Sequence, residues 1–213
     1  MYKIFFSTLF IISFSLLKAE NLPTNYFSWP VKHEIRLSGT FGELRSNHFH
    51  GGLDIKSAHG VEGDKLYSAA NGYIEKISVQ PHGYGNALYI KHPNGYTTVY
   101  GHMRSFSKEI EDFVKEYQYK EERFSQTIEL DPNQFPVEQG TYIGKMGNSG
   151  SSNGAHLHFE IRESKTNSQM NPLLFGLKIQ DEVSPLLSTL KLYEFDDENK
   201  IVSSRALKLK KKE

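Results

Sequence analysis

The sequence predicts a mainly β protein built on an antiparallel sheet, with one amphipathic helix inserted into it. Over residues 27–90, short apolar and β-branched runs alternate with glycine-rich turns, which is typical of short antiparallel strands. Residues 156–161 alternate polar and apolar side chains, as expected for a strand with one buried face. Only residues 107–122 change convincingly to helical spacing.

Two Asn-Gly pairs predict hairpin turns, because both residue types tolerate a positive φ. Asn71-Gly72 is the first pair, and it lies between strand-like runs at 65–70 and 73–77. Asn94-Gly95 is the second, and it should pair the run at 87–90 with that at 96–100. Further strands are expected over residues 127–130, 137–140 and 141–146.

The helical stretch has an apolar stripe between charged residues, formed by Ile110, Phe113, Val114 and Tyr117. Ser107 is available as its N-cap. The stripe predicts a helix that covers a sheet edge or an opening of the core, and that walls one side of a cleft.

Composition limits the classes of function. The chain has 213 residues, which suits one main domain plus a small appendage. Because 25 Lys and Arg balance 25 Asp and Glu, no global positive field attracts nucleic acid, and we expect no nucleic-acid partner. There is no cysteine, so any metal must be bound by histidine and carboxylate.

The N-terminus predicts a secretory signal over residues 1–19. Lys3 supplies a positive charge, residues 4–17 are mostly apolar, and Ala19 is a cleavage position. Four hydroxyl side chains dilute the apolar run, which is shorter than the roughly 20 residues of a membrane span. We therefore expect a secreted or periplasmic protein with no stable membrane insertion after removal of the signal.

The mature chain is expected in three parts. An N-terminal segment covers residues 20–37, and the main domain covers 38–178 with its insertion at about 104–136. Residues 179–213 form a β-hairpin or the stub of a further β domain, since a lone two-stranded hairpin is only marginally stable.

Two short motifs predict a metal site. His156 and His158 lie one pleat apart, so both imidazoles and Glu160 share a strand face. His50 and Asp54 offer a second nitrogen and an oxygen, and the two glycines between them would let the backbone turn sharply. A catalytic zinc takes three protein ligands and keeps one position open; His50, Asp54 and one of His156 or His158 meet that count.

The remaining histidines lack such a pattern and are interpreted as surface or turn residues, with His48 a candidate cleft residue: His33, His48, His59, His82 and His92. The small-residue loop over residues 147–154 leads into a strand rather than a helix. It therefore predicts a turn at the cleft rim and not a phosphate-binding loop.

Several runs together resemble the lysostaphin-type M23 metallopeptidases, in the order of that family and over about residues 38–175. These runs are Phe41-Gly42, His50-Gly51-Gly52-Leu53-Asp54-Ile55, Tyr84-Gly85-Asn86, Tyr100-Gly101-His102, Gly147-Asn148-Ser149-Gly150-Ser151-Ser152 and His156-Leu157-His158-Phe159-Glu160. The resemblance extends to members with a helical insertion after the central Tyr-Gly-His. It implies an M23-like β core and a peptidase acting on bacterial peptidoglycan.

The resemblance also implies roles for particular residues. His50, Asp54 and His158 would bind one Zn²⁺ per chain, with water in the fourth position. His102 and His156 would orient water or substrate and move protons. Residues 43–47 lack the tyrosine that some members use to polarise the substrate carbonyl; whether Arg45, Tyr84 or no residue replaces it stays open.

Two other functions are consistent with the sequence. The chain could be a catalytically silent M23-like regulator with a protein partner, although silent relatives typically lose ligands. It could also be a wall-binding module in which His48 or Glu160 closes the metal site as a fourth ligand. The sequence leaves open which peptide bond a peptidase would cut.

Overall fold

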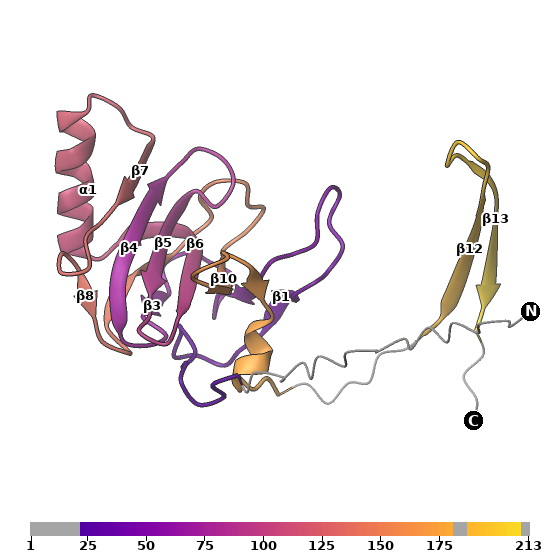
Figure 1. Cartoon of the computed structure of the whole chain (residues 1–213), viewed down its shortest axis with the longest axis horizontal. Helices are drawn as coiled ribbons and strands as arrows, with labels where there is room; N and C mark the ends of the chain where they lie inside the picture. Colours follow the sequence, from indigo (N-terminus) through magenta and orange to yellow (C-terminus); the bar gives the residue numbers. More distant parts are fainter. Residues whose placement is uncertain (1–21, 181–186, 210–213) are drawn as a thin grey trace, which may run out of the picture. The chain divides into compact units, whose positions relative to one another are not determined.

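The computed structural model describes residues 22–180 and 187–209. The predicted signal, residues 1–19, lies outside this range. The chain divides into two compact units, residues 1–179 and 180–213, drawn in Figure 1. No helix within the described ranges is long and apolar enough to cross a bilayer.

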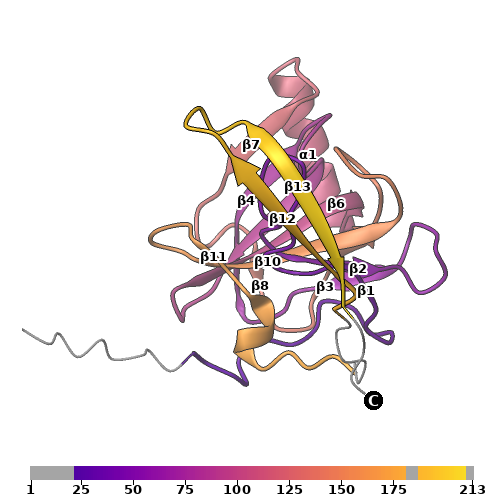
Figure 2. The same ribbon diagram turned by 90° about the vertical axis from the view of Figure 1, so that its right-hand side faces the viewer.

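The first unit contains an eleven-stranded antiparallel sheet, which confirms the predicted mainly β fold. Its strands are β1 (Leu37–Gly39), β2 (Leu53–Lys56), β3 (Lys65–Tyr67), β4 (Gly72–Val79), β5 (Asn86–Lys91), β6 (Tyr96–Phe106), β7 (Gln126–Glu129), β8 (Pro136–Val137), β9 (Tyr142–Met146), β10 (His156–Glu163) and β11 (Gln169–Met170). The helix α1 (Lys108–Lys120) follows β6, and a 3-10 helix, η1 (Pro172–Phe175), lies at the lower end of the unit in Figures 1 and 2.

The strand order is β1-β2-β10-β6-β5-β4-β7, with β11 beside β10, β8 beside β4, and β9 joining β3 to β6. This order places β2, β10 and β6 side by side in the sheet, although about a hundred residues separate β2 from β10 in the chain. Residues on neighbouring strands therefore meet there regardless of their distance in sequence.

The core lies on one side of these strands. Tyr100, Leu157 and Phe159 are fully buried there, as the alternation along β10 predicts. The segment before β1 adds to this core, because Phe27 is buried and its ring meets Phe175 edge to face at 5.4 Å. Residues 22–37 thus pack on the main domain.

The predicted helix is confirmed, with Ile110 and Val114 buried on its inner face. Ser107 occupies the N-cap position, but its side chain makes no capping hydrogen bond. Instead, the Glu111 carboxylate accepts a hydrogen bond from the backbone N–H of Phe106 at 3.0 Å. An acidic side chain in the first turn is also favoured by the helix dipole.

One predicted hairpin is confirmed and the other is wrong. Strands β5 and β6 pair across the second Asn-Gly, where Gly95 has a φ of +87°. At the first, β3 pairs with β9 and not with β4. Gly72 does not need a positive φ; a Cβ there would lie 2.1 Å from the Lys91 carbonyl oxygen, so glycine allows close approach of two backbones.

The second unit is a hairpin of β12 (Thr189–Phe195) and β13 (Ile201–Lys208). The two strands pair antiparallel from Thr189 opposite Lys208 to Phe195 opposite Ile201. In the turn, the Asp196 carboxylate accepts hydrogen bonds from two backbone N–H groups, and Asn199 adopts a φ of +60°.

His92, which the sequence placed at the surface or in a turn, is buried. Its Nδ1–H donates to the Asn71 carbonyl oxygen at 2.8 Å, and its Nε2 lies 2.8 Å from the Thr98 hydroxyl. Burial lowers the pKa of His92 to about 4, against the opposing effect of the hydrogen bond to Asn71. His92 is buried because Phe27, far away in sequence, covers the imidazole, with the two ring centroids 5.3 Å apart.

We expect His92 to make the fold less stable in acid. The unfolded chain takes up a proton at His92 near pH 6.5, whereas the folded chain does so only near pH 4. The free energy of unfolding should therefore fall as the pH drops from 7 to 5, by about 2 kcal/mol from this group. Denaturant titrations at both pH values should show a smaller drop in the free energy of unfolding for His92→Gln than for the unmodified chain. His82→Gln should show the same drop as the unmodified chain, since His82 is exposed. Equal drops in the two variants would contradict the assignment.

Candidate metal centre

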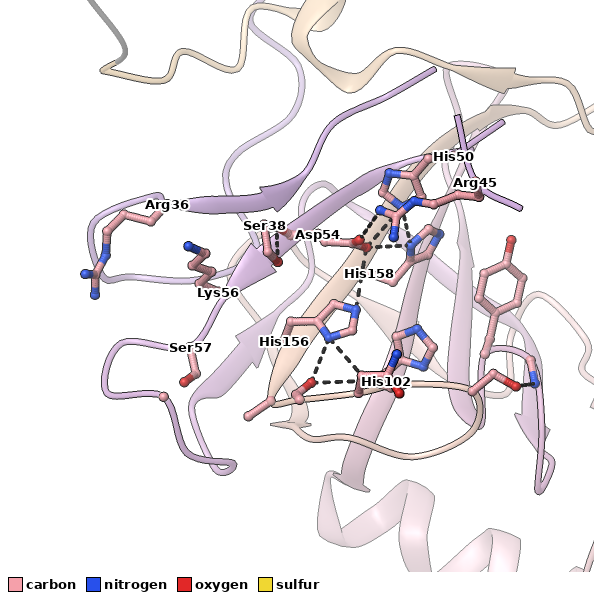
Figure 3. Close-up of a pocket in the computed structure, with 18 of the residues that line it drawn as sticks. Arg36, Ser38, Arg45, His50, Asp54, Lys56, Ser57, His102, His156 and His158 are labelled. Carbon is pink, nitrogen blue, oxygen red and sulfur yellow. Dashed lines mark hydrogen bonds and ion pairs between the residues drawn. The ribbon is translucent and has the colours of Figure 1, made fainter. Parts of the chain in front are cut away.

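The candidate metal ligands meet on one face of β2 and β10, beside β6, as Figure 3 shows. Asp54 on β2 lies opposite His158 on β10, and His158 in turn lies opposite Gly101 on β6. The loop before β2 supplies His50. Because directly opposed residues on paired strands share a face, the register alone places Asp54 beside His158.

The loop of His50 is held by its own backbone. The N–H of Gly42 donates to the His50 carbonyl oxygen, and the His50 N–H donates to the Glu43 carbonyl oxygen, both at 2.8 Å. A Cβ on Gly52 would lie 2.4 Å from the Phe159 carbonyl oxygen. Neither Gly51 nor Gly52 has a positive φ, so the glycines serve close packing rather than the sharp turn predicted from sequence.

Three ligand atoms form a compact triangle. His50 Nε2, His158 Nδ1 and Asp54 Oδ1 lie 3.0 Å from one another on every side. All three residues are buried, with side chains between 6% and 10% exposed. Within the part of the chain that the structure describes, this is the group of His and carboxylate side chains spaced to hold an ion.

The protons of both imidazoles are directed away from the triangle. His50 Nδ1 lies 2.8 Å from the Thr40 carbonyl oxygen, and His158 Nε2 lies 2.8 Å from the Glu160 carboxylate. Carbonyl and carboxylate oxygens only accept, so these two nitrogens carry the hydrogens in the neutral rings. Three unprotonated acceptors then point at one another, which is an arrangement that a cation stabilises.

The size of the triangle fits zinc. Tetrahedral ligands about 2.0–2.1 Å from a zinc ion are separated by about 3.3 Å, close to the separation found here. Glu160 contacts the opposite nitrogen of His158, and His48 lines the cleft without joining the group. The residues therefore suit an ion with three protein ligands.

The surroundings of Asp54 keep its carboxylate ionised. Burial by itself would raise the pKa of Asp54, but the imidazoles of His156, His158 and His50 around its carboxylate outweigh burial and hold that pKa well below its usual range. At His158, burial lowers the pKa, but hydrogen bonds with Asp54 and Glu160 raise it overall. A proton therefore competes with a metal ion for the Nδ1 position.

A buried network behind His158 holds its ring. Glu160 is fully buried and accepts hydrogen bonds from the Tyr84 hydroxyl, from Arg162 Nε and from Gln169 Nε2. Burial would raise the pKa of Glu160, but bonds with His158 and Arg162 lower it to about 2. An ionised partner of this kind fixes a ligand's orientation and raises its basicity. The alternation of His158, Glu160 and Arg162 along β10 is the sequence signal that could have revealed Arg162.

His102 reaches the cleft through an unusual backbone. Gly101 faces the cleft beside His158, so regular alternation would send His102 to the core side. Its φ of +61° breaks that alternation. The His102 Nδ1–H donates to the Ser149 carbonyl oxygen at 2.8 Å, which leaves Nε2 unprotonated. Burial lowers the pKa of His102 to about 4, partly opposed by that hydrogen bond.

His156 stands beside His102, with ring centroids 4.8 Å apart. Its Nδ1–H donates to the Gly154 carbonyl oxygen at 2.8 Å, and its Nε2 lies 3.5 Å from Asp54 Oδ1. The structure thus places His156 next to the triangle and His158 within it. Sequence spacing alone left the choice between these two residues open.

Arg45 lies at the edge of the triangle. Its Nη2 donates to Asp54 Oδ2 at 2.8 Å and to the Glu43 carboxylate at 3.3 Å. Its buried Nε has no hydrogen-bond partner in the structure. The Tyr84 hydroxyl, by contrast, is bound to Glu160. Of the two residues that could replace the absent tyrosine, Arg45 contacts the triangle directly, whereas the hydroxyl of Tyr84 is already engaged behind it.

The triangle opens into a cleft of about 1180 Å³. Its rim includes residues 151–155, consistent with the small-residue turn predicted there. None of the described residues of α1 lines the cleft, so the expectation that the helix walls it is wrong. In Figure 1 the helix lies beside β4 and β7, at the other end of the sheet order from β1 and β2.

Comparison with known proteins agrees with this class of fold. Residues 48–119 and 125–172 match the family model of peptidase family M23. The match covers more than half of the chain, which therefore belongs to peptidase family M23. The structure of the SpoIIQ–SpoIIIAH pore-forming complex shares its fold, with a TM-score of 0.53 and 22% identity over 74% of this chain and 94% of that one.

Two curated relatives indicate the range of the family. The chain is 30% identical over 140 residues to the DD-carboxypeptidase/endopeptidase Mpg of Neisseria meningitidis, covering 66% of this chain and 23% of the relative. It is 29% identical over 153 residues to the murein hydrolase activator NlpD of Escherichia coli, covering 72% and 32%. The chain therefore spans less than a third of the length of these relatives.

Proposed function

We propose that the protein is a zinc-dependent endopeptidase that hydrolyses peptide crosslinks or stem peptides of bacterial peptidoglycan. The observation that carries this proposal is the triangle of three unprotonated acceptors beside two histidines that face the same cleft. A closed structural site would not need His102 in a left-handed conformation. Strain of that kind is typical of functional positions.

His50, Asp54 and His158 would hold the ion, with one zinc per chain. A zinc ion there would act as a Lewis acid on a carbonyl oxygen and lower the pKa of water towards 7. Thr40 and Glu160 keep the two ligand imidazoles in the required tautomers. The rigid register of β2 and β10 keeps the ligand set assembled before substrate arrives.

We assign proton transfer during hydrolysis to His102 and His156. Both rings donate Nδ1–H to backbone carbonyl oxygens, so each presents an unprotonated Nε2. One of them would accept the proton of the attacking water, and that proton would then pass, directly or through the other imidazole, to the amine that leaves. We assign the hydrogen bond to the substrate carbonyl oxygen to the guanidinium of Arg45, which lines the cleft and contacts Asp54.

The substrate and location rest on the relatives and the N-terminus. Relatives named as an endopeptidase and as a murein hydrolase activator both point to the bacterial cell wall. We propose that residues 1–19 direct the chain to the periplasm or outside the cell, that residues 38–178 form the peptidase domain, and that residues 179–213 are an appended β element.

A regulatory role is the second candidate, supported by the resemblance to NlpD. In that case the chain would bind a wall hydrolase and cleave nothing itself. The intact triangle and the two adjacent histidines favour the peptidase, since a regulator has no need of them.

Digestion of purified peptidoglycan tests the proposal. The zinc-loaded chain should release peptide fragments, a chelator should stop the release, and added zinc should restore it. Mass analysis of the fragments would identify the bond that is cut. Stoichiometric zinc binding without fragment release from any type of peptidoglycan would overturn the peptidase and favour the regulator.

A further inference from the structure

The cleft carries more positive charge than the metal site requires. Among the residues that line it, Arg36, Arg45 and Lys56 are cationic, and Asp54 carries the one carboxylate. Arg45 is already bound to Asp54 and Glu43. Arg36 and Lys56 are exposed, and across the described ranges neither has a carboxylate within ion-pair distance.

The two free cations form a row beside the metal ligands. The Lys56 N–H donates to the Arg36 carbonyl oxygen at 2.8 Å, and Lys56 lies opposite His156. Lys56 follows Asp54 by two residues on β2, just as His156 precedes His158 by two on β10. Figure 3 shows Arg36 and Lys56 together on one side of Asp54.

The spacing of side chains along β2 sets the distance between the cationic row and the metal ligands. Side chains two apart on a strand share a face and are separated by about 7 Å. An extended peptide bound over the sheet advances by about 3.3 Å per residue. A group held by the cationic row therefore lies one or two residues from the bond at the metal centre.

Arg36 is also held in place. Its Nη2 donates to the Ala58 carbonyl oxygen at 2.9 Å, in the loop that follows β2. The rest of the guanidinium remains free to bind an acceptor. A planar, partly fixed donor group next to an ammonium is well suited to a carboxylate.

We infer that Arg36 and Lys56 bind a free carboxylate of the substrate, one or two residues from the scissile bond. This inference rests on the proposed function and narrows it. The preferred substrate is then an anionic, directly crosslinked stem peptide. A neutral glycine bridge, or a stem peptide whose carboxylate is amidated, lacks the group that the row recognises.

A pair of synthetic crosslinked peptides tests this, identical except that one carboxylate near the scissile bond is a carboxamide in the second. Binding to the full chain is measured with zinc and with a chelator. The carboxylate peptide should bind roughly tenfold more tightly in both conditions, and the preference should shrink as salt rises. With zinc, the preference should appear in KM rather than in kcat.

The double variant Arg36→Gln/Lys56→Gln should bind both peptides equally, with affinity for the carboxamide within about twofold of the unmodified chain. Lys115→Gln, on the exposed face of α1, is the matched control and should keep the preference. The inference is overturned if the unmodified chain shows no preference, if neither peptide binds, if the double variant keeps the preference, or if the chelator abolishes it. If the chain prefers the carboxylate peptide but releases no fragments from walls, the peptidase proposal is overturned and the carboxylate site stands.

Discussion

Asp54→Ala is expected to lose zinc and peptidase activity together. Asp54 Oδ1 is one of three ligand atoms, and two imidazoles alone bind the ion weakly. Bound zinc after dialysis should fall from about one per chain to below roughly a tenth, and fragment release should fall by at least about a thousandfold. Elemental analysis of the dialysed protein and mass analysis of digested walls measure the two effects.

The control for this variant separates loss of metal from loss of fold. Asp112→Ala removes an exposed carboxylate on α1 and should change neither quantity. Circular dichroism should show the same strand content in both variants, because the Asp54 side chain contributes no strand hydrogen bond. Normal zinc occupancy in Asp54→Ala would contradict the proposed ligand set.

The sequence predicted a candidate ligand group from its two short motifs, but the choice of His158 over His156 came from the resemblance to the M23 family. Alternation along 156–161 fixes which face of β10 carries the histidines, and antiparallel pairing with β2 then brings Asp54 opposite His158. The mainly β class and the helix after β6 follow from equally local patterns. The fold class, the helix and the face that carries His156 and His158 depend on spacing within a single element, whereas the meeting of Asp54 with His158 depends on the pairing of β2 with β10.

Features that depend on contacts between elements were not predictable in this way. Gly72 looked like a hairpin glycine, but it is required by the backbone of β5. His92 looked exposed, but Phe27 covers it. The hydrogen bond of Arg45 to Asp54 joins residues whose proximity is set by the loop before β2.

His102→Ala is expected to keep the metal and lose turnover. His102 is not part of the ligand triangle, and its ring centroid lies 5.9 Å from that of His158. Removal of a proton carrier typically lowers kcat by about 10²- to 10⁴-fold. Single-turnover digestion of a defined crosslinked peptide, together with zinc analysis of the same sample, measures both quantities.

A second variant separates chemistry from backbone strain. The φ of +61° at position 102 suits glycine better than any other residue, so His102→Gly relieves the backbone strain that His102→Ala retains. If His102 acts through its imidazole, the glycine variant is as slow as the alanine variant, and added imidazole partly restores its rate. If His102 only shapes the cleft, His102→Gly keeps its activity and imidazole has no effect. Loss of zinc from either variant would instead place His102 among the ligands.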